Sequence, residues 1–151
     1  MIKIITVGNI KENYLKEAIL EYKKRLSKYT NIEIIEVKDE GLVEKEKAIF
    51  IEGEKIKKHL NAKDYIITLE INGQELTSIE FSNRLDKILI ENSNIAFIIG
   101  GSYGLSKDIT SLSKMHLSFS KMTFPHQLFR VILLEQIYRA FKIKNNESYH
   151  K

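Results

Sequence analysis

Short apolar runs rich in isoleucine and valine alternate along this chain with stretches that have the period of an amphipathic helix. Four runs have the length and β-branched content of strands: Ile2 to Val7, Ile32 to Val37, Tyr65 to Ile71 and Ile95 to Ile99. The segment Leu117-Ser118-Phe119 is a shorter candidate. Because strands that are joined through helices form parallel sheets, this alternation predicts an α/β fold with a largely parallel sheet.

Three stretches between the runs are expected to be helical. Apolar side chains from Tyr14 to Tyr29 recur every three or four residues, which predicts a helix with one core-facing side. The charged stretch Leu42 to Leu60 is only loosely periodic and predicts a helix with a solvated outer side. After an expected turn at Asn72-Gly73, Thr77 and Glu80 have the spacing of a capping box, which predicts a helix start.

The last helix is expected from Gln127 to Lys144, after the one proline, Pro125, whose fixed φ suits a helix start. Its apolar residues occupy most of its circumference: Leu128, Val131, Leu134, Tyr138 and Phe141 on one side, and Ile132 on another. A terminal helix in a small domain normally buries one side, so the second side favours a partner surface, most simply another copy of this chain. A helix threaded deep inside the monomer is the alternative.

Size and composition favour one soluble unit. A chain of 151 residues with 43% hydrophobic content can bury a core by itself, so residues 1–151 are expected to form a single domain. The absence of cysteine excludes disulfides and thiolate metal sites. We find no secretory signal and no apolar stretch of membrane-spanning length, which predicts a cytoplasmic protein with no membrane partner.

The excess positive charge lies at the C-terminal end. Residues 1–120 carry 18 basic and 18 acidic side chains, whereas residues 121–151 carry six and two. A local basic surface attracts phosphate-rich partners, although six charges on a helix and tail also form an ordinary solvated face. Charge alone leaves both interpretations open.

The usual reactive constellations are missing. The four histidines, His59, His116, His126 and His150, have neither the spacing nor the carboxylate neighbours of a zinc site, so no metal is expected. The segment Gly100 to Gly104 lacks the lysine of a P-loop and the spacing of a dinucleotide-binding loop. Metal and nucleotide-phosphate chemistry are therefore disfavoured.

Two loops at strand ends are the best candidates for a binding site. Glycine in the segment Ile98 to Gly104 lets a ligand approach the main chain, and Leu117 to His126 interleaves hydroxyl and apolar side chains before the last helix. Such loops at the carboxyl ends of neighbouring strands would form a cofactor cleft that packs an adenine between apolar side chains. The structural alternatives are a tight strand-to-helix turn and a core strand followed by a capped helix.

Taken together, the segments resemble the ribosomal large-subunit pseudouridine N3-methyltransferase family, the small single-domain branch of the SPOUT methyltransferases. The resemblance covers essentially the whole chain and is carried by Val7-Gly8, Glu21 to Leu26, Gly100-Gly101 with Gly104-Leu105, Leu117 to Gln127, Arg130-Val131, Glu135 to Ala140 and Tyr149-His150-Lys151. It implies a sheet with helices on both faces and a C-terminal trefoil knot, a rare exception to unthreaded topology, with a cofactor-binding region at approximately residues 95–143.

The resemblance also implies a function. Members are homodimers that use S-adenosyl-L-methionine to methylate N3 of one pseudouridine in 23S rRNA on the assembled ribosome. By position, the cofactor contacts would be Leu69, Gly100, Phe119, Ser120, Lys121, Met122, Thr123 and Phe124. The knot would bend the cofactor and present its methyl group toward the dimer interface.

In the family the C-terminal tail of one subunit reaches the cofactor site of the other. Tyr149 and His150 are therefore the expected active-site pair, with Arg139 as an anion or phosphate contact. A frayed terminus and a helix-surface charge are the alternatives for these residues. His126 ranks below His150, and Tyr103, which departs from the smaller residues of the family's glycine loop, would stack on the incoming base or cover the loop.

Two other functions are considered. A noncatalytic ribosome- or RNA-binding module with the same fold predicts ribosome association without methyl transfer. A flavodoxin-like nucleotide or flavin binder is disfavoured because the loop Gly8 to Lys11 offers little phosphate cradle.

Overall fold

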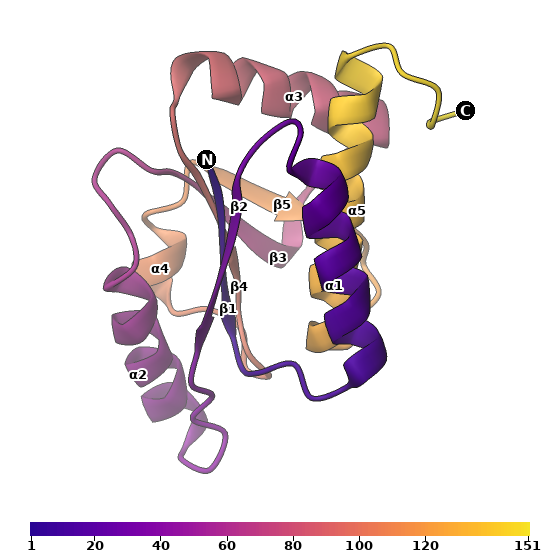
Figure 1. Cartoon of the computed structure of the whole chain (residues 1–151). Helices are drawn as coiled ribbons and strands as arrows, with labels where there is room; N and C mark the ends of the chain where they lie inside the picture. Colours follow the sequence, from indigo (N-terminus) through magenta and orange to yellow (C-terminus); the bar gives the residue numbers. More distant parts are fainter.

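A five-stranded sheet separates two layers of helices in the computed structural model, which describes residues 1–151 (Figure 1). The strands are β1 (Ile2–Val7), β2 (Ile32–Val37), β3 (Tyr65–Glu75), β4 (Ile95–Ile99) and β5 (Met115–Ser118). The helices are α1 (Asn13–Leu26), α2 (Lys45–Lys57), α3 (Ser78–Glu91), α4 (Lys107–Thr110) and α5 (His126–Lys144). Helices α1, α3 and α5 cover one face, and α2 and α4 cover the other. None of the helices combines the length and apolar content that a membrane span requires.

All neighbouring strands are parallel, in the order β2-β1-β4-β3-β5, which confirms the predicted α/β class. In the middle of the sheet, β1 pairs with β4 from Ile2 opposite Ile95 to Thr6 opposite Ile99, and both strands are buried throughout. Strands that are covered on both faces carry apolar side chains on both, which explains their isoleucine-rich runs. The chain leaves β1 toward β2 and β4 toward β5, so the two connections diverge.

Strand β3 is longer than the sequence predicted. It continues to Glu75, so the turn expected at Asn72-Gly73 is wrong. Its pairing with β5 shifts register between Leu69 and Gln74, and a Cβ on Gly73 would lie 2.8 Å from a backbone carbon of Leu117. Glycine occupies this position because two backbones pass close together, not because the chain reverses.

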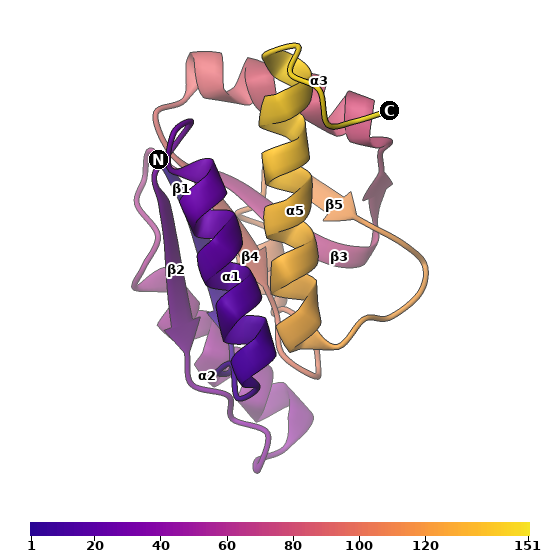
Figure 2. The ribbon, with the colours of Figure 1, turned by 45° about the vertical axis from the view of Figure 1, so that its right-hand side comes forward.

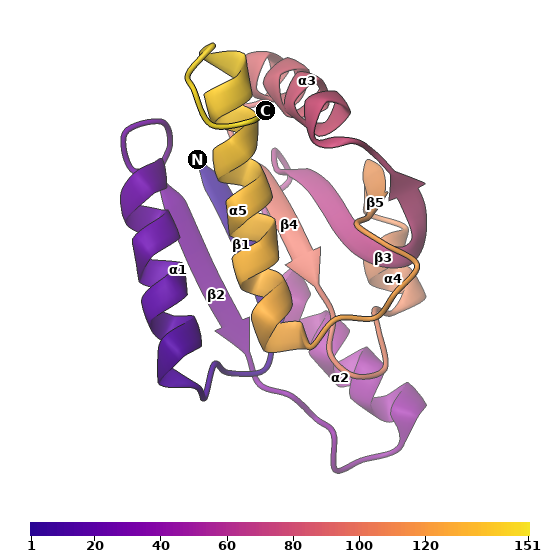
Figure 3. The ribbon, with the colours of Figure 1, turned by 90° about the vertical axis from the view of Figure 1, so that its right-hand side faces the viewer.

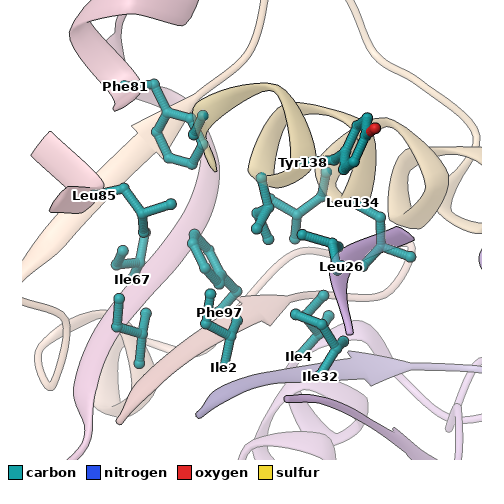
Figure 4. Packing of buried hydrophobic residues seen from close by; sticks show 14 of the residues in the cluster. Ile2, Ile4, Leu26, Ile32, Ile67, Phe81, Leu85, Phe97, Leu134 and Tyr138 are labelled. Carbon is teal, nitrogen blue, oxygen red and sulfur yellow. The ribbon is translucent and has the colours of Figure 1, made fainter. Parts of the chain in front are cut away.

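The larger core lies between the sheet and the layer of α1, α3 and α5. Figure 4 shows its side chains facing one another from the strands and helices, among them Ile2, Ile4, Ile67, Phe81, Leu85, Phe97, Leu134 and Tyr138. Alternate residues of β1, Ile5 and Val7, enter a smaller core beneath α2. Each such buried side chain contributes about 1.5–3 kcal/mol relative to exposure, so the two cores hold the strand ends in place.

A buried ion pair ties β1 to the loop before β3. Lys3 Nζ lies 2.9 Å from Asp64 Oδ2 and donates to the carbonyl of His59 at 2.7 Å, and the side chains are 5% and 0% exposed. Asp64 also accepts a hydrogen bond from the Asn61 N–H at 2.8 Å. Removal of either partner would leave an uncompensated charge in the interior.

The helix starts follow local chemistry. Thr77 Oγ1 accepts from the Glu80 N–H at 3.1 Å, and the Glu80 carboxylate accepts from the Thr77 N–H at 2.7 Å, which confirms the predicted capping box. Helix α1 begins one residue before the predicted stretch Tyr14 to Tyr29 and ends three residues before its end, and α2 lies within the predicted stretch Leu42 to Leu60. The one-turn helix α4 was not predicted, and β5 ends at Ser118, so Phe119 belongs to the following loop and not to the strand.

Helix α5 packs beside α1 along the sheet, and α3 crosses near its C-terminal half (Figure 2). Three of the predicted apolar residues of α5 are buried: Leu134, Tyr138 and Phe141. Val131 and Ile132 are half-buried, and Leu128 is 39% exposed. The monomer therefore covers Leu134, Tyr138 and Phe141 but leaves Leu128, which was predicted on the same side, and Ile132 partly uncovered in the first half of the helix.

Candidate active site

A cavity of about 470 Å³ lies at the ends of β4 and β5 and beside the part of β3 where its pairing with β5 shifts register. Its walls come from the segments 69–72, 99–105 and 117–124 and from two residues of α5. The structure brings seven of the predicted cofactor residues into this lining: Leu69, Gly100, Phe119, Ser120, Met122, Thr123 and Phe124. Lys121, the eighth, is exposed and does not line the cavity. We call this space the glycine-loop cavity.

The first wall is a tight turn of exposed main chain. Gly101 and Gly104 form an isolated antiparallel bridge, and the Gly104 N–H donates to the Gly101 carbonyl at 3.0 Å. Gly104 has φ +84°, a conformation that favours glycine. A Cβ on Gly100 would lie 2.9 Å from the Gly104 carbonyl group. Backbone atoms therefore form this surface because side chains have no room, and Tyr103 lines the rim with 41% of its area exposed.

The second wall is the loop between β5 and α5. Ser118 Oγ donates to the Ser120 carbonyl at 3.1 Å, and the Met122 N–H donates to Ser120 Oγ at 3.0 Å, so two serines shape the loop. The ring of Phe119 packs 5.1 Å from that of Phe129. These contacts place apolar and main-chain groups on the same wall, as an adenine-sized ring requires.

Glu70 is a cavity residue that the sequence interpretation missed. It supplies the one carboxylate in the lining and follows the predicted Leu69 directly. Thr68 Oγ1 donates to its carboxylate at 2.6 Å, and His116 Nδ1 contacts the same oxygen. The signal available in the sequence was an acid near the end of the predicted strand Tyr65 to Ile71, which is informative only once this part of β3 is known to border a cavity. Glu70 gives the cavity a negative edge.

Two of the three predicted catalytic residues, Arg139 and Tyr149, contact Glu135 of α5, and the third, His150, contacts Arg139. Arg139 NH2 lies 2.7 Å from Glu135 Oε1, and the Tyr149 hydroxyl donates to the same oxygen at 3.0 Å. Arg139 NH1 lies 3.1 Å from His150 Nδ1. Because a guanidinium only donates, Nδ1 accepts, which leaves the proton of the neutral imidazole on Nε2. The sequence predicted this trio but not its contacts with Glu135.

The C-terminal tail packs against α5 instead of fraying. The Tyr149 ring lies 5.0 Å from that of Tyr138, edge to face, and the Arg139 guanidinium lies 4.7 Å above the Tyr149 ring. Just before the tail, the Glu147 carboxylate accepts a hydrogen bond from Lys142 Nζ at 2.8 Å, which holds this segment against α5. Burial, together with the Glu135 carboxylate, raises the pKa of Tyr149 to about 12. Tyr149 is therefore a neutral hydrogen-bond donor at physiological pH.

Within one chain, the trio and the cavity are apart. His126, the first residue of α5, lines the cavity, and Arg139 lies roughly 20 Å further along the helix axis at 1.5 Å per residue. Figure 3 shows the C-terminus at the end of the molecule opposite to the loops that follow β1 and β4. The trio therefore does not reach the cavity of its own chain.

The donor set suits an organic ligand. No group of three or more histidine, cysteine, aspartate or glutamate side chains is placed to hold a metal ion. The cavity has the volume of small-molecule sites, a main-chain turn in which Gly100 lies too close to Gly104 for a Cβ, and aromatic walls. A nucleoside-like ligand fits these features.

Comparison with known proteins identifies the family. A model described as "Predicted SPOUT methyltransferase" matches residues 1–150. The chain belongs to the SPOUT methyltransferase family. Relatives named ribosomal RNA large subunit methyltransferase H are 53% identical in Clostridium tetani and 54% identical in Clostridium botulinum, each over 99% of both chains. A protein of Methanococcus maripaludis is 55% identical over the same shares.

A solved structure from Haemophilus influenzae, described as a probable methylase family protein, shares the fold of this chain. It matches with a TM-score of 0.59 and 13% sequence identity, over 99% of this chain and 70% of its own. The SPOUT assignment and the parallel sheet thus agree.

Proposed function

We propose that this protein is an S-adenosyl-L-methionine-dependent methyltransferase that methylates N3 of a pseudouridine in 23S rRNA on the assembled ribosome. The observation that carries the proposal is the glycine-loop cavity, a site of main-chain and aromatic walls without a metal cluster, in a chain of the SPOUT methyltransferase family. The full-length similarity to large-subunit rRNA methyltransferases supports the substrate. Such a protein would act in the cytoplasm, where ribosomes are.

The residues of the cavity would hold the cofactor. Gly100 offers its main chain at close range, Leu69 and Phe124 supply apolar surface, and Ser120 and Thr123 supply hydroxyls. Lys121, outside the lining, would act only through its backbone or its charge. When bound, S-adenosyl-L-methionine supplies an already activated methyl group. The protein therefore needs to bind and orient two partners, and orientation of this kind contributes roughly 7–11 kcal/mol to catalysis.

The trio would orient the acceptor base and accommodate its charge. An imide nitrogen must lose its proton before or during methyl transfer, and a nearby cation stabilises the resulting anion. Arg139 supplies a permanent positive charge, Tyr149 a neutral hydroxyl donor, and His150 an Nε2–H donor that can bind the base, while the N3 proton leaves to water. We assign catalysis to these three residues, with Glu135 as the residue that positions Arg139 and Tyr149.

The separation of trio and cavity supports a homodimer. Because the trio lies at the far end of its own chain, the C-terminal tail of a second copy would have to complete each site. The partly uncovered apolar residues of α5, Leu128 and Ile132, offer a contact surface for that copy. We further propose that residues 1–151 act as one domain and that approximately residues 95–143 are threaded into a trefoil knot.

Methyl transfer from radiolabelled S-adenosyl-L-methionine tests the function. Intact ribosomes should accept methyl groups, naked 23S rRNA should accept few, and mapping should locate the methyl group on N3 of one pseudouridine. Association with ribosomes without methyl transfer would instead indicate a noncatalytic module. Calorimetry that detects no binding of the cofactor would overturn the proposal at its first step.

A further inference from the structure

A second cavity, of about 300 Å³, opens at the carboxyl ends of β1, β2 and β4. It adjoins the glycine-loop cavity, with which it shares Gly101, Ser102 and His126. Val7 is the one apolar residue in its lining, whereas half of the residues around the glycine-loop cavity are apolar. We call it the polar cavity, and its chemistry suits a charged ligand.

The polar cavity lies where the sheet connections diverge. The chain leaves β1 toward β2 and leaves the adjacent strand β4 toward β5. Crevices at such switch points are where open parallel sheets bind ligands. Figure 3 shows the loop after β1, the loop after β4 and the start of α5 meeting at this edge of the sheet.

The charges around the polar cavity are mainly positive. Lys11 and Lys38 line it, and neither ammonium group has an ion-pair or hydrogen-bond partner in the chain. Asp39 is the one carboxylate in the lining. His126 adds an imidazole ring to the lining. Two free ammonium groups against one carboxylate attract an anion.

A buried arginine is held at the edge of this cavity by an ion pair. Arg130 is 1% exposed and lines the polar cavity; its NH1 donates to Glu36 Oε2 at 2.7 Å and its NH2 to the Gly8 carbonyl at 2.7 Å. Its Nε is buried and has no partner. Because the Glu36 carboxylate balances the guanidinium charge, the excess positive charge of the cavity comes from Lys11 and Lys38.

The loop that carries Lys11 is held by side chains from two other elements. The Ile10 N–H donates to Glu36 Oε2 at 2.9 Å, and the Lys11 N–H donates to Gln127 Oε1 at 2.9 Å. The base of the Lys11 side chain is therefore positioned before any ligand arrives, which lowers the entropic cost of binding.

We propose that the polar cavity binds a backbone phosphate of the substrate RNA, next to the base that is methylated. The inference rests on the proposed function. S-adenosyl-L-methionine carries a carboxylate but no phosphate, so the two sources of an anion are separated by cofactor affinity. Affinity that is unchanged by the lysine substitutions assigns the anion to the acceptor, and weaker cofactor binding would overturn the proposal. The shared residues Gly101 and Ser102 place that phosphate beside the glycine-loop cavity, and Lys11 and Lys38 pair with it.

Equilibrium binding to intact ribosomes over a range of salt concentrations tests this proposal. Lys11→Ala and Lys38→Ala should each weaken binding by about tenfold, since each removes a charge-assisted contact. Each should also reduce the slope of log K against log salt by about 0.7–0.9. The control is Lys63→Ala, which removes the same charge from the exposed loop before β3, at the amino edge of the sheet. Calorimetry should find unchanged cofactor affinity in all three variants.

The outcomes separate the two claims. Ribosome affinity and salt slope equal to those of Lys63→Ala in both variants would overturn the phosphate site. Loss of methyl transfer with an unchanged salt slope would also overturn it, because the cavity would then hold an uncharged part of the RNA. The proposed function fails if the wild-type protein transfers no methyl group to ribosomes. This measurement needs none of the lysine variants, so it is independent of the phosphate site.

Discussion

Gly100 offers a direct test of the glycine-loop cavity. A Cβ at this position would lie 2.9 Å from both the carbonyl carbon and the carbonyl oxygen of Gly104, and 3.1 Å from Leu105 Cδ2. Backbone atoms cannot rotate away as the tip of a side chain can, so Gly100→Ala must displace the turn that lines the cavity. Overpacking of this kind costs about 1–3 kcal/mol.

The same displacement should weaken cofactor binding, because a ligand seated on the main chain needs the turn in its original place. An energy of about 1–3 kcal/mol corresponds to a fall in affinity for S-adenosyl-L-methionine of about 5- to 150-fold. Isothermal titration calorimetry measures the affinity, and urea unfolding measures the stability of the same sample.

Gly41→Ala is the matched control. The nearest atom to its added Cβ is Asp39 Oδ1 at 3.3 Å, the movable end of a side chain, and Gly41 lies outside the cavity lining. This variant should bind the cofactor as wild type does. A folded Gly100→Ala protein with wild-type affinity would refute the reasoning, since the main chain of the turn would then not be part of the cofactor surface.

Three further predictions concern the ion pair in the core and the tail. Asp64→Asn leaves the buried ammonium of Lys3 without its counter-charge. It should lower the free energy of unfolding by about 3–5 kcal/mol in urea titrations. A loss below about 1 kcal/mol would contradict the argument that the ion pair is buried. Burial raises the pKa of Tyr149 from 10.0 to about 12, so the folded state holds this proton more tightly than the unfolded state does. The stability of wild type relative to Tyr149→Phe should thus be complete below pH 10 and decline as the pH rises through 12, and a difference independent of pH would exclude this effect. His150→Ala and deletion of residues 149–151 should abolish most methyl transfer to ribosomes while calorimetry finds cofactor affinity retained; unchanged turnover in both would remove the tail from the active site.

Much of the fold could be predicted because its signals are local. The runs that became β1, β2 and β4 were predicted with their observed ends, since buried parallel strands need continuous apolar residues. The Thr77 capping box was predicted because both of its hydrogen bonds depend on a spacing of three residues. The prediction of a turn at Asn72-Gly73 was wrong. Glycine occurs there because the backbone of β5 passes close by, and no pattern among neighbouring residues indicates such a contact.

The residues of the two cavities also fall into those that the sequence indicated and those that it did not. Gly100 and the segment 119–124 stood out through their composition and through resemblance to a family, and the cavity then gathered most of them. Glu70 and the polar cavity did not stand out, because Lys11, Lys38 and Arg130 come from segments far apart in the chain. Their relation follows only from the order of the strands.

The sequence by itself determined the alternation of strands and helices, the family and the residues of the two loops, because periodicity, capping and motif spacing act over a few neighbouring positions. The tertiary structure decided which loops share a cavity, that Arg139 and Tyr149 meet at Glu135 with His150 against Arg139, and that this trio lies away from the cavity of its own chain. Those facts depend on the strand order β2-β1-β4-β3-β5 and on the length and direction of α5. Parallel strands carry the ends of distant segments to one edge of the sheet, and only the packed chain places them side by side.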